Sequence, residues 1–246
     1  MAKTKKPRID EALVGRGLVE DLSEARKRIM AGEVLCGDRR IDKPGTPVDP
    51  DSPLRLKTRQ GKFVSRGGLK LEGALDSFNP IVAGRIALDL GASTGGFTDC
   101  LLQRGAAKVY AVDVGTNQLD YRLRIDPRVV VLERTHAKTL DRTKVPDPIE
   151  LLVADVSFTS LRYVLPHVIP LLAPAATGVC LFKPQFEVPR ERVTAGGLAE
   201  PSDAEQTLSE LWSWLQGQGL RQRGQMKSPV KGRDGNQEYL LWWETT

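Results

Sequence analysis

The chain has 246 residues, of which 40% are hydrophobic and 27% are charged, as is ordinary for a soluble globular protein. Its net charge of +5 is concentrated near the start, because residues 1–70 carry 17 Lys and Arg against 10 Asp and Glu, whereas the remainder carries 19 against 21. Three distant cysteines and only two histidines argue against a metal site, and the prolines within the apolar region 164–182 argue against a membrane span. The basic N-terminus leads into no apolar run, which argues against an export signal, so we expect a cytoplasmic protein.

The first part of the chain is expected to be a small α+β module. Apolar spacing and turn residues predict a helix within 8–21, a helix within 22–34, a hairpin over 33–42 and a strand over 54–57. Ser23 is expected to cap the second helix, and Met30 to lie on its apolar side. The excess positive charge favours a polyanion as partner, with a merely solvated basic surface as the alternative.

This order of elements over residues 8–57 resembles the RNA-binding domain named after ribosomal protein S-four. The resemblance implies that basic side chains contact RNA phosphates. The expected RNA-binding residues are Arg26, Lys27, Arg28, Arg39, Arg40 and Arg66. We therefore expect an RNA-binding domain over 1–58, a linker over 59–66 and a second domain over 67–246.

From residue 67 on, helices and strands alternate, which predicts an α/β domain with a Rossmann-like, mostly parallel sheet. The expected strands are 85–93, 108–115, 128–133, 149–157 and 178–183, and the expected helices are 67–78, 95–106, 160–173 and 202–219. Two further strands, 220–230 and 236–245, follow without a helix between them. We therefore expect the sheet to finish with an antiparallel strand.

The turn after the first of these strands, "LDLGASTGGF", has the chemistry of a cofactor site. It lacks the G-x-G-x-x-G spacing of a dinucleotide-binding turn, and Asp89 before it would repel a pyrophosphate. An ammonium-bearing ligand such as S-adenosylmethionine suits it better, with Asp113 at the end of the next strand bonding the ribose hydroxyls. NAD would use the same acid, so Asp113 alone does not identify the cofactor, and a purely structural strand–helix turn is the alternative. The expected cofactor-binding residues are Asp89, Gly91, Ser93, Thr94, Gly95, Gly96, Phe97, Asp113 and Asp155.

Two further charged residues end neighbouring strands of the predicted sheet. Asp155 ends "VADVSF", and Lys183 ends "GVCLFK" just before a proline. Each has a structural explanation, since a terminal lysine often reaches water and a terminal aspartate often caps a helix. Together they lie at the sheet edge where ligands bind in open α/β folds, which favours a catalytic role.

The motifs "SRGGLKLEGAL", "LDLGASTGGFTD", "LLVADVSFTSL", "LFKPQFE" and "GNQEYLLW" resemble the TlyA family of ribosomal RNA 2′-O-methyltransferases, whose members were once labelled hemolysins. The resemblance covers almost the whole chain. It implies S-adenosylmethionine as cofactor and a catalytic domain of the FtsJ type with a Lys–Asp–Lys–Glu tetrad. By the matching motifs, that tetrad falls on Lys70, Asp155, Lys183 and Glu238.

The expected activity is therefore 2′-O-methylation of ribosomal RNA, and the family resemblance implies cytidine as the target. Members of the family modify one or both ribosomal subunits; the C-terminus is similar to that of the shorter form, which favours the large subunit and leaves the choice of subunit open. A protonated lysine is a poor base, but desolvation and a second ammonium from Lys70 would ease proton loss from Lys183. We expect Lys183 to deprotonate the hydroxyl or to orient it. A non-catalytic RNA-binding protein and a cytolysin are the alternatives. Ribosomal RNA or subunits are the expected partners of a monomer.

Overall fold

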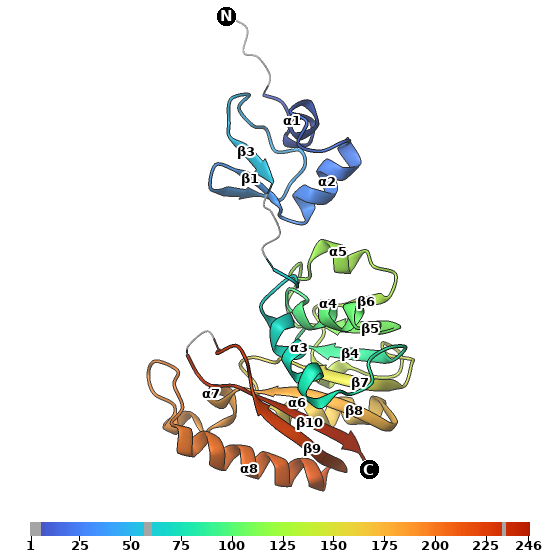
Figure 1. Cartoon of the computed structure of the whole chain (residues 1–246), viewed down its shortest axis with the longest axis vertical. Coiled ribbons are helices and arrows are strands. Elements are labelled where there is room, and N and C mark those ends of the chain that lie inside the picture. The colour runs from blue at the N-terminus through green and yellow to red at the C-terminus, as the bar shows by residue number, and fades with distance from the viewer. Residues whose placement is uncertain (1–5, 57–60, 233–234) are drawn as a thin grey trace, which may run out of the picture. The chain divides into compact units, whose positions relative to one another are not determined.

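The computed structural model describes residues 6–56, 61–232 and 235–246. The chain divides into two compact units (Figure 1). The first comprises the residues up to Gln60 and is grouped with Asp120–Arg122, and the second comprises the remaining residues from Gly61 on. Part of the expected linker, 59–60, and the last residue of the expected strand over 54–57 lie outside the described residues. The expected boundary at residue 67 stays a prediction, although the side chain of Phe63 already packs into the core of the second unit.

The first unit is the predicted pair of helices on a small antiparallel sheet. Its elements are α1 (Ile9–Gly15), α2 (Leu22–Met30), β1 (Val34–Cys36), β2 (Arg39–Ile41) and β3 (Leu54–Leu56), with the strands in the order β2-β1-β3. The β1–β2 hairpin turns at Gly37, whose φ of +61° lies in the left-handed region that glycine adopts without strain. Apolar side chains from both helices and all three strands form one core.

Two local predictions for α2 are wrong. The helix is capped by Asp21, whose carboxylate accepts from the backbone N–H of Glu24 at 2.7 Å, and not by Ser23, which lies in its first turn. Aspartate and serine are comparable caps, so composition alone did not separate the two. Met30 is 42% exposed, because the buried stripe of this short helix consists of Ala25 and Ile29.

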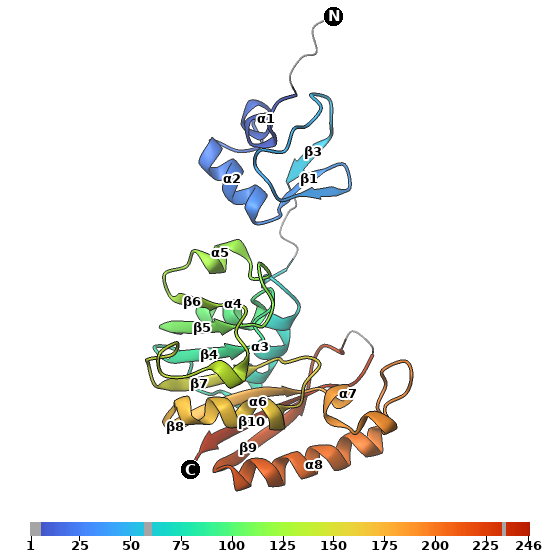
Figure 2. The same ribbon diagram turned by 180° about the vertical axis from the view of Figure 1, so that it is seen from behind.

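The second unit is built on a seven-stranded sheet in the order β6-β5-β4-β7-β8-β10-β9 (Figures 1 and 2). The strands are β4 (Ile86–Leu90), β5 (Lys108–Val112), β6 (Val129–Leu132), β7 (Ile149–Ala154), β8 (Leu172–Phe182), β9 (Leu220–Lys227) and β10 (Tyr239–Thr245). Pairing is parallel from β6 to β8, and β10 is antiparallel to both β8 and β9. The predicted Rossmann-like sheet with an antiparallel final strand is confirmed.

Helices cover both faces of this sheet, as the two opposite views show. The helices are α3 (Gly67–Phe78), α4 (Gly96–Gln103), α5 (Tyr121–Arg124), α6 (Leu161–Val168), α7 (Pro184–Glu187) and α8 (Pro201–Gly217). The side chains of α3 and α4 pack into one buried cluster, and those of α6 and α8 pack into another. The parallel strands are therefore buried on both sides, which is why they read as nearly continuous apolar runs.

The largest departure from the sequence prediction lies at β8. A helix was expected over 160–173 and a strand only from 178, but α6 ends at Val168 and the strand already begins at Leu172. Pro166 is tolerated within α6, whereas the chain after Val168 leaves the helix at a 3₁₀ turn that contains Pro170.

Among the described residues, no helix is both long and apolar enough to cross a bilayer.

Candidate active site

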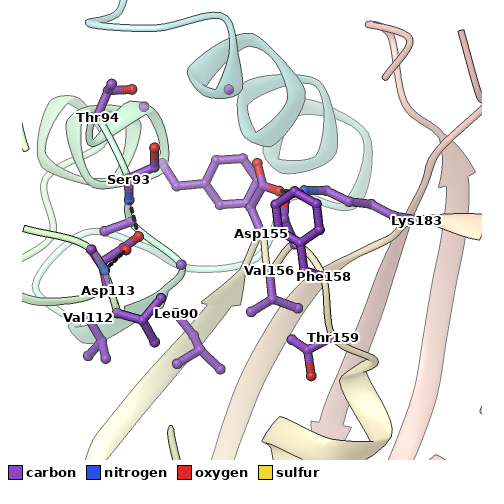
Figure 3. Close-up of a pocket in the computed structure, with 18 of the residues that line it drawn as sticks. Leu90, Ser93, Thr94, Val112, Asp113, Asp155, Val156, Phe158, Thr159 and Lys183 are labelled. Atoms are coloured by element: carbon purple, nitrogen blue, oxygen red, sulfur yellow. Dashed lines mark hydrogen bonds and ion pairs between the residues drawn. The ribbon is translucent and has the colours of Figure 1, made fainter. Parts of the chain in front are cut away.

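A cleft of about 820 Å³ lies at the carboxyl ends of the parallel strands in the second unit. Its walls are the turn after β4, the ends of β5 and β7, the segment after β8 and the start of α3, and Figure 3 shows part of it. Ligands of open α/β sheets bind at this edge, next to the point where the strand order reverses. Here the reversal falls between β4 and β7, because β5 and β6 lie on one side of β4 and β7 on the other.

Three glycines of the turn after β4 lie where there is no room for a Cβ atom. Gly91 has φ +85°, and a Cβ there would lie 2.5 Å from the backbone oxygen of Asp155. Gly95 has φ +94°, and a Cβ there would overlap the side chain of Leu123. At Gly96, the first residue of α4, a Cβ would lie 2.8 Å from the backbone nitrogen of Gly68. Ser93, Thr94, Phe97 and the first and last of these glycines line the cleft.

Asp113, which follows β5, ties two loops of the cleft together. Its Oδ2 accepts from the backbone N–H of Ser93 at 2.7 Å, and its Oδ1 accepts from the backbone N–H of Gly115 at 2.7 Å (Figure 3). Each carboxylate oxygen can accept more than one hydrogen bond. The two carboxylate oxygens of Asp113 can therefore still accept hydrogen bonds from hydroxyl groups of a ligand at the end of β5.

Asp89 lies beneath the turn and not among the residues that line the cleft. Its carboxylate is fully buried, Oδ2 accepts from the Thr98 hydroxyl at 2.7 Å, and Oδ1 has no hydrogen-bond partner among the described residues. Burial, with a smaller contribution from the nearby carboxylate of Asp155, raises the pKa of Asp89 to about 7. A buried acid with an unpaired oxygen favours positive charge nearby.

Four charged residues that are far apart in the sequence come together in the cleft as two ion pairs. Nζ of Lys183 lies 2.5 Å from Oδ1 of Asp155 and donates to the Ser157 hydroxyl at 2.8 Å (Figure 3). The ammonium of Lys70, on α3, is paired with the carboxylate of Glu238, just before β10. Glu238 is only 2% exposed. Thus every member of the expected tetrad lines the same cleft.

Buried lysine–carboxylate pairs are costly to desolvate, so their presence needs a compensating role. Both lysines are nearly buried, with side chains 12% exposed at Lys70 and 10% at Lys183. Each ammonium keeps donor capacity beyond its carboxylate partner. The cleft therefore presents two ammonium groups, each held in place by a carboxylate.

An exposed aromatic residue at the rim was missed by the sequence analysis. Phe158 is 91% exposed, lines the cleft and has φ +60°, an uncommon backbone conformation for a bulky residue. Its ring lies 5.2 Å from that of Phe186, and the Phe186 ring lies 5.9 Å from Nζ of Lys183. The only sequence signal was an apolar residue in the polar segment after Asp155. Such a ring is a stacking surface for a planar ligand.

Glu187 holds this part of the cleft in place and was also missed. Its carboxylate accepts from the Ser160 hydroxyl at 2.5 Å and from the backbone N–H of Leu161 at 2.7 Å, at the start of α6. Burial raises the pKa of Glu187. The two bonds tie the segment that carries Phe158 to α7, which carries Phe186.

The expected RNA-binding residues fall into three groups. In the first unit, Nε of Arg26 bonds the buried carboxylate of Asp10 at 3.3 Å, and Arg28 is paired with Glu24 and Glu33. Lys27, Arg39 and Arg40 are exposed, and among the described residues none of them has an acidic partner. Arg66 belongs to the second unit, where it is exposed and lines the cleft.

The sheet order, the glycine turn after β4 and the acid after β5 define a methyltransferase of the Rossmann-like class. A family model described as FtsJ-like methyltransferase matches residues 63–245, and one described as S4 domain matches residues 7–53. The chain therefore belongs to the FtsJ-like methyltransferase family and carries an S4 domain in front, which confirms the resemblance drawn from the sequence motifs.

Relatives cover nearly the full chain. A candidate rRNA methyltransferase of Bacillus subtilis, YqxC, is 47% identical over 97% of this chain and 85% of its own length. The 16S/23S rRNA (cytidine-2′-O)-methyltransferase TlyA of Mycobacterium tuberculosis is 44% identical over 98% of this chain and 91% of its own. Among solved structures, a candidate hemolysin from Streptococcus thermophilus is 40% identical with a TM-score of 0.73, covering 99% of this chain and 90% of that one.

Proposed function

We propose that this protein methylates the 2′-hydroxyl of a cytidine in ribosomal RNA, with S-adenosylmethionine as the methyl donor. The observation that carries the proposal is the pair of lysine–carboxylate ion pairs that line the same cleft as the glycine turn. Cytidine and ribosomal RNA are carried over from the name of the Mycobacterium tuberculosis relative. A ribosomal substrate also implies the cytoplasm as the place of action.

The residues present fit this donor. When bound, S-adenosylmethionine supplies an electrophilic methyl group on a sulfonium sulfur. Ser93, Thr94 and the glycines of the turn after β4 would hold it, and Asp113 would accept from its ribose hydroxyls. The unpaired oxygen of the buried Asp89 supports a cationic ligand above the turn.

Lys183 is placed to act on the acceptor. A ribose hydroxyl is too weak an acid to ionise in neutral water, so it must lose its proton to a base or be held in a positive field. Lys183 lies between Asp155 and Ser157 at the end of β8. As an ammonium it can orient the hydroxyl oxygen, and it could accept the hydroxyl proton only as the neutral amine, after giving up a proton of its own. Lys70, held by Glu238, would stabilise the developing negative charge on this oxygen.

The proposal is tested by incubating the protein with methyl-labelled S-adenosylmethionine and ribosomal particles from a strain that lacks the gene. We expect label in ribosomal RNA at one or a few cytidines whose 3′ linkage becomes resistant to alkaline hydrolysis, since 2′-O-methylation blocks that cleavage. Separate incubations with each subunit test the expectation that the large subunit is the substrate. Label on bases, or none in either subunit, would contradict the proposal.

The cofactor half of the proposal predicts the effect of Asp113→Ala. The change removes the acceptor for ribose hydroxyls and frees the backbone N–H groups of Ser93 and Gly115. We expect affinity for S-adenosylmethionine, measured by calorimetry, to fall by on the order of tenfold to a hundredfold, the effect of one or two charge-assisted hydrogen bonds. Asp126→Ala, which removes a surface partner of Arg128, is the matched control. If wild type, Asp113→Ala and Asp126→Ala bind S-adenosylmethionine with equal affinity, Asp113 does not bind its ribose.

The part of the proposal that concerns the RNA nucleotide predicts the effect of Phe158→Ala. If the exposed ring stacks on a nucleobase, its removal should raise KM for ribosomal particles about tenfold and leave cofactor affinity unchanged. Tyr163→Ala is the control, since Tyr163 is 76% exposed and does not line the cleft. Unchanged KM in the Phe158 variant would exclude a stacking role.

A further inference from the structure

The cleft contains two cations besides those of its ion pairs. Lys70 and Lys183 are each paired with a carboxylate, so these two pairs together carry no net charge. Arg66 and Lys231 also line the cleft and are exposed. In the part of the chain that the structure describes, neither of these two side chains has a hydrogen bond or an acidic partner. Their charges are therefore available to a ligand.

The two unpaired cations lie on different sides of the cleft. Arg66 directly precedes Gly67, and a Cβ on Gly96 would lie 3.2 Å from the Cα of Gly67, so Arg66 is beside the glycine turn after β4. Lys231 lies between β9 and β10, and these strands are the farthest from β4 on the side of the sheet where β8 and Lys183 also lie. Lys231 is therefore the unpaired cation nearer to the RNA nucleotide of the proposed reaction.

The segment that carries Lys231 packs against the ion pair of Glu238. A Cβ on Gly232 would lie 2.8 Å from Oε1 of Glu238, so the backbone next to Lys231 runs close to that carboxylate. A Cβ on Gly73 of α3 would lie 2.9 Å from Cγ of Pro229. The start of this segment is thus held against α3, and the Lys231 side chain extends from a backbone that is fixed beside the tetrad.

A ribose 2′-hydroxyl within RNA always has a phosphodiester beside it. The 2′-oxygen and the 3′-phosphate are attached to neighbouring carbon atoms of the ribose, so a negative charge enters the cleft together with the hydroxyl. Lys70 and Lys183 are already neutralised by their own carboxylates. An anion in a partly desolvated cleft is costly unless it is paired, and an ammonium without a partner can supply the charge-assisted hydrogen bond that offsets this cost.

We infer that Lys231 is a phosphate-binding residue, whose ammonium contacts a phosphodiester next to the target ribose. A lysine binds phosphate as a point charge on a flexible stem, and it needs no particular base beside that phosphate. Lys231 therefore contributes affinity for the RNA backbone and not selectivity for a base. The inference rests on the proposed function and adds a backbone-binding residue within the second unit.

The test compares Lys231→Gln with wild type on ribosomal particles. We expect KM for the particles to rise about tenfold at moderate salt, with kcat unchanged, because the contact stabilises the bound substrate and the transition state equally. In filter binding, the slope of log affinity against log salt should flatten by about one, as expected for one lost phosphate contact. Lys231→Arg keeps the charge and should stay within about threefold of wild type in KM.

Lys227→Gln is the matched control. It removes the same charge at the end of β9, from a side chain that is exposed and does not line the cleft. It should have the KM and the salt dependence of wild type. Since both lysines are exposed, neither change to glutamine should lower the melting temperature. Affinity for S-adenosylmethionine, measured by calorimetry, should be the same in all of these proteins.

An equal loss of ribosome affinity in Lys227→Gln and Lys231→Gln would overturn the inference, because it would reflect the net charge of this edge and not a contact in the cleft. Wild-type KM and salt dependence in Lys231→Gln would also overturn it and leave the proposed function standing. Weaker binding of S-adenosylmethionine by Lys231→Gln would assign the ammonium to the carboxylate of the methyl donor instead. A wild-type protein that methylates no ribosomal RNA would overturn the proposed function, and this inference with it.

Discussion

Lys183→Ala is expected to lower methyl transfer to ribosomal RNA by on the order of a thousandfold while affinity for S-adenosylmethionine stays within about twofold of wild type. The physical reason is that Lys183 faces Asp155 and Ser157 at the end of β8 and not the glycine turn after β4. Single-turnover transfer measures the chemical step, and calorimetry measures cofactor binding. Transfer within tenfold of wild type would remove Lys183 from the mechanism.

Two further variants distinguish the possible roles of this lysine. Lys183→Arg keeps a positive charge but cannot act as a base at neutral pH. If Lys183→Arg is much more active than Lys183→Ala, Lys183 orients the hydroxyl. If both variants are equally inactive, the result supports proton transfer to Lys183. Lys144→Ala serves as the matched control, because Lys144 bonds Thr139 outside the cleft. It should methylate at the wild-type rate.

The second large effect is expected in the S4 domain. Neutralising its unpaired cations with Lys27→Gln, Arg39→Gln and Arg40→Gln together should lower ribosome affinity at least about tenfold at moderate salt. The slope of log affinity against log salt should flatten by about one for each lost phosphate contact. Glutamine keeps part of the aliphatic stem of each side chain and removes the charged end, which at Arg40 packs over Gly32. Filter binding across a salt titration measures both quantities.

Paired and unpaired cations should behave differently in this domain. Arg26 and Arg28 are bonded to acids, and Asp10, the partner of Arg26, has its pKa lowered chiefly by the hydrogen bond from Arg8. Substituting these two should lower stability as well as binding, and therefore gives a less direct test. Arg55→Gln, which loses only an exposed contact with Asp38, is the control. If the triple variant binds ribosomes like wild type at every salt concentration, this surface does not contact RNA.

Much of the site could be predicted because its residues end strands. A charged side chain after a buried apolar run, as at Asp155 and Lys183, lies at the sheet edge whatever the details of packing. The glycines of the turn after β4 could also be recognised from the sequence, because several glycines directly after a strand indicate a sharp turn, and in the structure a Cβ at Gly91 or Gly96 would overlap backbone atoms. Lys70 and Glu238 came from the family resemblance, because nothing in the local pattern around them shows that they pair.

What could not be predicted depends on contacts between segments distant in the sequence. Glu187 acts through Ser160 and Leu161, some 26 residues earlier, and no local pattern connects the two. At β8, the prediction of a longer helix followed the apolar residues after Val168, whereas Ile169–Leu171 form a 3₁₀ turn and the residues from Leu172 on extend the strand.

The close approach of Gly91 to Asp155 couples the two halves of the cleft. A Cβ at Gly91 would lie 2.5 Å from the carbonyl oxygen of Asp155, and the backbone N–H of Asp155 in turn donates to the carbonyl of Leu90 at 3.0 Å. Main chain packs on main chain here, so the spacing between the turn after β4 and the backbone of Asp155 does not depend on any side-chain rotamer. Evolution can therefore exchange residues around the rim to change which nucleotide enters, while the alignment of donor with acceptor is inherited unchanged from the backbone.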